Sequence, residues 1–235
     1  IINDRHDKVP ALRQALSSTN WEDVDLVFAV GDMMNDPMTE RQMFEKFINP
    51  CAEFFAARIP MVLVRGNHET RGAMARHVMD YFPTESGRYY YSFTHGGVYF
   101  LLLDGGEDKD DAMPVYAGLV AFDDYVKEQT DWLEQELRSS AFREARFRLC
   151  LLHIPPVVNL RHDPAEFMRA PWIRDNWTPM LGQAGIDLMI SGHTHRYAEM
   201  PAEEGRAFPL LIGGTNTVIR VDVSPQLMQF TTYND

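Results

Sequence analysis

The segment Pro60-Met61-Val62-Leu63-Val64-Arg65-Gly66-Asn67-His68-Glu69 joins a short apolar run to a polar turn. The run has the length and the β-branched content of a buried strand, and Gly66 marks its end. The same organisation recurs at residues 25–30, 147–152 and 186–190, which end in Gly31-Asp32, His153 and Ser191-Gly192-His193. Near-continuous apolar runs are typical of strands buried on both faces, so they predict a largely parallel inner sheet.

Helical patterns separate these strands. They cover Pro10–Ser18, Thr39–Ala57, Arg71–Tyr81 and Phe122–Leu137. Antiparallel pairs are expected at Tyr89–Phe93 with Val98–Leu103, and again within the last 30 or so residues. The alternation predicts one α/β domain over residues 1–235 with a mixed sheet system. Because the chain begins with Ile1 in what resembles the end of a strand, we expect a segment upstream of it.

Each predicted strand ends in residue types that bind metals. They are Asp4, His6, Asp32, Asn67, His153, His193 and His195. Ligands gather outside the carboxyl ends of the strands in an open α/β sheet, so these side chains should converge. Two carboxylates, one amide oxygen and four imidazoles suit Mn, Fe, Zn, Co or Ni. Seven ligands are too many for one such ion and suffice for two when a carboxylate bridges them.

These motifs resemble those of the calcineurin-like metallophosphoesterase family. Asp4-x-His6, Gly31-Asp32, Gly66-Asn67-His68-Glu69, His153 and Gly192-His193-Thr194-His195 run in the family's order from residue 4 to residue 195. The resemblance implies a four-layer α/β/β/α sandwich with two mixed sheets. It also implies two divalent or trivalent transition metal ions, for which Mn, Fe and Zn are the candidates.

The resemblance implies a role for each residue. Asp4, His6 and His195 would bind one metal, Asn67, His153 and His193 the other, and Asp32 would bridge them. A metal-bridging hydroxide would then attack the phosphorus atom of a phosphate ester in line, and His68 would protonate the leaving group. The group that orients His68 stays open, with Asn35 and Asp36 as the possible partners.

One position separates this chain from two subfamilies. Purple acid phosphatases place a tyrosine ligand of ferric iron where this chain has Asn35, and phosphoprotein phosphatases place an Asp followed by Arg-Gly there. We therefore expect no tyrosinate-to-iron colour. The substrate would be a small-molecule phosphate ester. The alternatives are a narrow-specificity nucleotidase or cyclic phosphodiesterase, and a binding scaffold that has kept the fold and lost catalysis.

The chain is acidic, with 34 Asp and Glu against 22 Lys and Arg and a net charge of −12. This balance argues against a broad nucleic-acid-binding face, because contacts to phosphates dominate such binding. Eleven of the acids and two bases lie between Asp104 and Leu137. We interpret this stretch as a solvated loop followed by the outer face of a surface helix, remote from the metals. The acids lack the spacing of an EF-hand loop.

Other residues carry weaker signals. Cys51 and Cys150 are too few for a disulfide framework, and the sequence contains no run long and apolar enough for a transmembrane helix. His77 and His95 have no predicted role. A long loop after His153 could contact substrate through Arg161, His162, Trp172 and Trp177, although packing explains the tryptophans equally well. Compartment and oligomeric state stay open, with an extracytoplasmic location slightly favoured if an upstream signal was removed.

Overall fold

The larger of two β-sheets forms the middle of the molecule. In the computed structural model, which describes residues 1–157 and 168–234, this sheet has six strands in the order β3-β4-β5-β6-β8-β7. They are β3 (Tyr91–His95), β4 (Val98–Leu103), β5 (Phe147–Leu152), β6 (Leu188–Ser191), β8 (Leu210–Ile212) and β7 (Ala198–Met200). The inner pairs are parallel and the two edge pairs are antiparallel. The apolar runs predicted at 147–152 and 186–190 are therefore neighbouring parallel strands of this mixed sheet, and those predicted at 25–30 and 60–64 lie in the other sheet.

The second sheet is held together by the first two residues. Strands β1 (Val27–Val30) and β2 (Met61–Val64) pair in parallel, and β9 (Thr217–Val223) pairs with β10 (Met228–Asn234) in antiparallel. Ile2 bridges to Ala29 in β1, and Ile1 exchanges backbone hydrogen bonds of 2.7 and 3.1 Å with Ile219 in β9. Through these bonds the two pairs form one mixed sheet.

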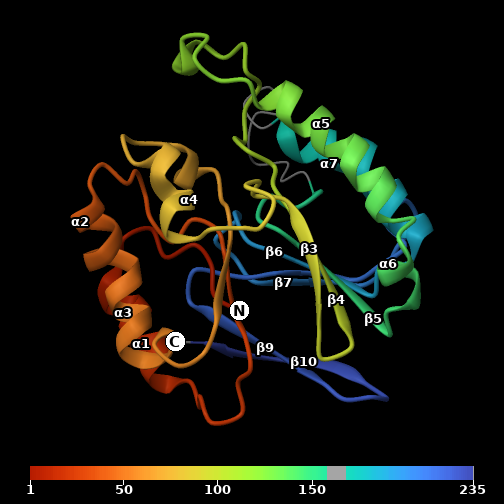
Figure 1. Cartoon of the computed structure of the whole chain (residues 1–235), viewed down its shortest axis with the longest axis horizontal. Helices are drawn as coiled ribbons and strands as arrows, with labels where there is room; N and C mark the ends of the chain where they lie inside the picture. The colour runs from red at the N-terminus through yellow and green to blue at the C-terminus, as the bar shows by residue number, and fades with distance from the viewer. Residues whose placement is uncertain (158–167, 235) are drawn as a thin grey trace.

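Helices cover the outer faces of both sheets (Figure 1). Helices α5 (Phe122–Glu136), α6 (Ser140–Glu144) and α7 (Arg169–Ala184) pack on the larger sheet around Trp177. Helices α1 (Val9–Ser18), α2 (Glu40–Met43), α3 (Asn49–Cys51) and α4 (Val78–Tyr81) pack on β1 and β2. A third apolar cluster, containing Phe28, Phe100 and Ile219, fills the space between the sheets. The result is the predicted four-layer α/β/β/α sandwich.

Two predicted helices differ in detail. The 39–57 helix forms, with a capping box between Thr39 and Gln42, but it contains two π-helical segments, Phe44–Ile48 and Ala52–Ala56. The 71–81 helix is wrong for its first turn. Gly72 has a φ of +75°, and a Cβ there would lie 2.5 Å from the Pro37 carbonyl oxygen. Helical structure therefore starts only at a 3-10 turn, Ala75–His77, which leads into α4.

The predicted long loop after His153 is wrong for its second part, because residues 169–184 form helix α7. Trp177 is fully buried on this helix, and its indole Nε1 donates a 2.8 Å hydrogen bond to Thr130 Oγ1 in α5. Trp172 stacks edge-on against it, with ring centroids 5.3 Å apart. Trp177 therefore lies in the core, and the half-buried Trp172 packs against it. Arg161 and His162 lie outside the described residues.

The acidic stretch that starts at Asp104 was predicted to begin as a solvated loop, and the structure shows otherwise. Asp104, Glu107 and Asp108 are buried, with 0, 2 and 5% of their surface exposed. Asp104 pairs with Arg65 at 2.5 Å, and Glu107 pairs with Arg71. A buried carboxylate is stable only when it is paired and hydrogen-bonded, and these three acids meet that condition. The solvated loop was therefore the wrong interpretation for the first part of the stretch.

No helix in the described part of the chain has the length and apolar character that a membrane crossing requires.

Candidate active site

The predicted ligands meet at the carboxyl ends of strands from both sheets. Asp4 and His6 follow the bridge at Ile2, and the remaining residues follow β1, β2, β5 and β6. The structure brings all seven together. In one group, single donor atoms of Asp4, His6, Asp32 and His195 lie within 4.8 Å of one another, and in a second group those of Asp32, His153 and His193 do. Asn67 joins the second group, with Oδ1 3.0 Å from His193 Nδ1.

Five of these residues have left-handed backbone conformations, with φ of 53° at Asp4, 44° at His6, 54° at Asp32, 71° at His193 and 61° at His195. Non-glycine residues rarely adopt such angles, and each costs on the order of 1–3 kcal/mol. Such costs persist where surrounding structure fixes the backbone, and they cluster at functional sites. The strain therefore marks this edge of the sheets independently of the side chains.

Asp32 has one carboxylate oxygen for the backbone and one for the donor groups. Oδ1 accepts the His68 backbone N–H at 3.0 Å. Oδ2 lies 3.1 Å from His153 Nε2 and 3.7 Å from His6 Nε2. Because the first bond fixes the carboxylate, the second oxygen lies between the two groups, which is the position that a bridging ligand needs.

His153 provides the test of whether these residues fit a metal. Its Nδ1 lies 2.8 Å from the Val30 carbonyl oxygen and donates a hydrogen bond to it, so Nε2 is the nitrogen left to bind a metal. That Nε2 is buried and faces the Asp32 carboxylate, with Oδ2 3.1 Å away. The Nε2 atoms of His6 and His195 likewise face each other at 2.8 Å. Imidazole nitrogens directed at one another beside carboxylates suit transition metal ions.

Burial and charge set the protonation of these imidazoles. Burial and the charge of His153 lower the pKa of His193 to about 4, so His193 is neutral and ready to bind a metal near pH 7. Burial opposes a charge on His153 too, but the Asp32 carboxylate outweighs it and raises the pKa of His153 to about 10. A metal ion bound at His153 therefore has to replace a proton.

Glu69 holds the backbone of the two turns that carry Asp32 and Asn67, a role that was not predicted from the sequence. Its buried carboxylate accepts backbone N–H groups of Asp32, Met33, Met34 and Gly66 at 2.8–3.1 Å. It thereby ties the turn after β1 to the turn after β2. Its position inside Gly66-Asn67-His68-Glu69 was the available signal. Burial and the Asp32 charge raise the pKa of Glu69 to about 7.

Asn35 orients His68. The His68 Nδ1 donates to the Asn35 backbone carbonyl at 3.0 Å, and the Asn35 side-chain oxygen lies 3.1 Å from His6 Nδ1. His68 Nε2 is then directed to the site, 4.0 Å from Asp32 Oδ2. Of the two possible partners, Asn35 rather than Asp36 supplies the acceptor. Burial lowers the pKa of His68, and the nearby Arg71 charge acts in the same direction.

Arg71 is a cation beside His68 that the sequence analysis did not identify. Its Nε and Nη2 donate to the two oxygens of Glu107 at 2.8 and 2.9 Å. Its Nη1 lies 3.0 Å from His68 Nε2 and 3.4 Å from His68 Nδ1. An approach along the Nε2–H direction would leave Nδ1 much farther away, so Nη1 lies over the face of the ring. Arg71 therefore does not occupy the direction from Nε2 toward Asp32 Oδ2.

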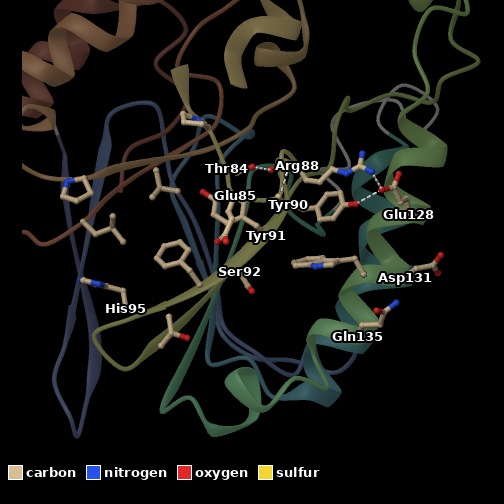
Figure 2. Close-up of a pocket in the computed structure, with 18 of the residues that line it drawn as sticks. Thr84, Glu85, Arg88, Tyr90, Tyr91, Ser92, His95, Glu128, Asp131 and Gln135 are labelled. Atoms are coloured by element: carbon tan, nitrogen blue, oxygen red, sulfur yellow. Dashed lines mark hydrogen bonds and ion pairs between the residues drawn. The ribbon is translucent and has the colours of Figure 1, made fainter. Parts of the chain in front are cut away.

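A separate groove of about 1010 Å³ lies along β3, one of the two edge strands of the larger sheet (Figure 2). Tyr91 and Phe93 line it from β3, and Glu128 and Asp131 line it from α5. None of the seven predicted ligands contributes to its lining. His95 lies in this groove and His77 pairs with Asp80 at the surface, so neither reaches the donor groups.

Two sheets packed between helix layers, with nitrogen and oxygen donors gathered at the strand ends, define a metallophosphoesterase fold. The family model of calcineurin-like phosphoesterases (Metallophos) matches residues 1–197. The chain therefore belongs to this family, and all seven predicted ligands lie within the matched stretch.

Relatives in the family are named as phosphatases. The serine/threonine-protein phosphatase CPPED1 of Bos taurus is 32% identical over 142 residues, which cover 60% of this chain and 42% of the relative. Purple acid phosphatase 23 of Arabidopsis thaliana is 24% identical over 165 residues, which cover 66% of this chain and 31% of the relative. The chain thus spans less than half the length of these relatives.

Solved structures agree with the fold. A dimetal phosphatase from Danio rerio matches with a TM-score of 0.60 at 16% identity, over 99% of this chain and 90% of its own. GAP50, described as the anchor in the inner membrane complex of Plasmodium, matches with a TM-score of 0.65 at 15% identity, over 91% and 70%.

Proposed function

We propose that this chain hydrolyses a phosphate ester with the help of two metal ions. The observation that carries the proposal is the Asp32 carboxylate, which belongs to both donor groups. Asp4, His6 and His195 would hold one ion, and Asn67, His153 and His193 the other. Mn, Fe and Zn suit this set best, because it combines imidazole with oxygen and contains no sulfur.

Two such ions lower the pKa of water and offset negative charge on a phosphoryl group. The chain supplies the remaining chemistry. Hydrolysis forms a bond from a water oxygen to phosphorus and breaks the ester bond, so the departing oxygen needs a proton. His68 would donate it from Nε2, because Nδ1 is already committed to the Asn35 carbonyl. The Arg71 guanidinium over the ring disfavours the imidazolium, which makes protonated His68 a stronger acid.

The donor set argues against the scaffold alternative. A scaffold has no need to keep seven donors in place, five of them in strained backbone conformations. The relatives' names allow either a small-molecule or a protein phosphate as the substrate. We favour a small-molecule ester and expect no tyrosinate-to-iron absorption, because Asn35 cannot provide a phenolate.

The test combines metal content with a hydrolysis screen. Wild-type protein reconstituted with Mn, Zn or Fe should hold two ions per chain and hydrolyse at least one aryl phosphate. Asp32→Ala should lose both ions and at least about 10³-fold in turnover, because it removes a ligand from both groups. Asp131→Ala, at an exposed acid on α5, is the matched control and should retain both. Full activity in Asp32→Ala would contradict the proposal.

A further inference from the structure

We infer that Arg71, held by Glu107, makes this site selective for phosphomonoesters over phosphodiesters. The inference rests on the proposed phosphoesterase function and adds the class of its substrate. It starts from the position of the Arg71 guanidinium beside His68, the residue proposed to protonate the leaving oxygen.

The Arg71 guanidinium is held by Glu107 through Nε and Nη2, whereas Nη1 takes no part in that pair. Two of its nitrogens donate to the two oxygens of Glu107, which is nearly fully buried and also accepts the Thr70 hydroxyl at 2.9 Å. The Arg71 side chain keeps 29% of its surface exposed. A two-bond fork of this kind fixes the plane of the guanidinium. Nη1 is consequently presented to the site at a constant position.

Burial of Glu107 raises the cost of its charge, but the hydrogen bonds and charge of Arg71 outweigh it and lower the pKa of Glu107. The pair is therefore ionised at neutral pH. A phosphate oxygen at Nη1 would not have to compete with Glu107, because Glu107 occupies only Nε and Nη2.

The charge of the substrate then decides the preference. A phosphomonoester carries three non-bridging oxygens and close to two negative charges near neutral pH, whereas a diester carries two such oxygens and one charge. If two oxygens are held at the two donor groups, a monoester has a third oxygen left for Arg71. In a diester that third oxygen carries a carbon substituent and no negative charge, so it is a much weaker acceptor for Arg71.

The test compares Arg71→Ala and Arg71→Lys with wild type on 4-nitrophenyl phosphate and bis(4-nitrophenyl) phosphate. Arg71→Ala should lose roughly 10- to 100-fold in kcat/KM on the monoester, the amount expected for one hydrogen bond to a charged group, and less than threefold on the diester. Arg71→Lys should recover part of the monoester rate. Arg76→Ala, at an exposed arginine on the neighbouring 3-10 turn, should leave both rates unchanged.

A binding measurement separates this inference from the proposed function. With two ions bound, calorimetry should show that inorganic phosphate binds more tightly than dimethyl phosphate, and that Arg71→Ala reduces this preference by the same factor. An unchanged preference, or equal loss on both esters, would overturn the inference and leave the hydrolase proposal standing. Wild-type protein that holds two ions and cleaves neither ester would instead refute the hydrolase. A single cooperative urea transition in each variant, at a lower midpoint for Arg71→Ala because Glu107 then loses its partner, would show that the variants are folded.

Discussion

Glu69→Gln is the sharpest test of how the fold supports the site. The Glu69 carboxylate accepts four backbone N–H groups, those of Asp32 and Gly66 at Oε2 and those of Met33 and Met34 at Oε1. All four bonds are buried. A glutamine has nearly the same shape, but only one of its terminal atoms can accept. In either orientation of the amide, two N–H groups face an NH₂ group.

The expected loss follows from this count. A buried donor left without an acceptor costs about 1–3 kcal/mol, so two of them cost about 2–6 kcal/mol. Domains of this size are stable by only about 5–15 kcal/mol, so the loss is a large share of the total. The same change should weaken metal binding, because the turn that carries Asp32 loses its attachment to the turn that carries Asn67.

Urea unfolding of the metal-free protein, followed by tryptophan fluorescence, measures the loss of unfolding free energy. Metal titration measures the loss of metal affinity. Glu45→Gln is the matched control, because Glu45 lies on the surface with only an exposed ion pair to Arg41, a kind worth at most about 1 kcal/mol. A loss below about 1 kcal/mol in Glu69→Gln would refute the assigned role.

The stability difference between wild type and Glu69→Gln should depend on pH. The pKa of Glu69 is raised from 4.5 to about 7, first by burial and then by the Asp32 charge. The folded state therefore binds this proton more readily than the unfolded state does. The advantage of wild type over Glu69→Gln should be greatest below pH 4.5 and decline as the pH rises to about 7. An advantage that grows over this range would contradict the assignment.

Two further variants test separate parts of the molecule. His68→Ala should reduce hydrolysis of alkyl phosphates about 10²- to 10⁴-fold and hydrolysis of 4-nitrophenyl phosphate much less, because nitrophenolate leaves without a proton. Rates across a series of leaving groups measure this, and equal losses would remove the acid role. Trp177→Phe should lower the free energy of unfolding by at least about 1 kcal/mol, through loss of the bond to Thr130 and through the cavity that the smaller ring leaves, with metal content unchanged. Loss of metal in that variant would mean that α7 supports the site.

The strands could be predicted because their residues are buried on both faces. Runs such as Leu149-Cys150-Leu151-Leu152 are apolar at every position, and no solvated structure tolerates that. Strands β7 and β8 have three residues each, which is too short for any periodicity. The joining of the two strand pairs into one sheet through Ile1 and Ile2 is a tertiary contact between opposite ends of the chain.

Helix α7 was not predicted from the sequence because it contains two prolines. Pro171 lies in its first turn, where the missing N–H costs little, but Pro179 lies in its interior and normally ends a helix. Ile173, Trp177 and Leu181 are buried against the larger sheet. Packing of this apolar face outweighs the local cost of Pro179, and that gain is visible only once the sheet is known.

The donor residues could be predicted because each one follows a strand, and strand ends share an edge. Arg71 and Glu107 could not, because their pairing joins positions 36 residues apart. A buried acid in an acid-rich stretch looks the same in sequence as its solvated neighbours. The distinction arises only from the arginine that folding brings to it.

Buried ion pairs also change the meaning of the net charge of −12. The three buried acids of the 104–137 stretch are matched by cations, Asp104 by Arg65, Glu107 by Arg71 and Asp108 by Lys109 at 2.8 Å. A neutral pair exerts a field that falls off faster than that of a single charge, so these acids oppose an approaching phosphate only weakly. Exposed acids such as Asp131 lie farther out, where salt screens charges beyond about 8–10 Å. The acidity of the chain is therefore compatible with an anionic substrate, because these buried acids are neutralised by their partners and one of them, Glu107, holds Arg71 beside His68.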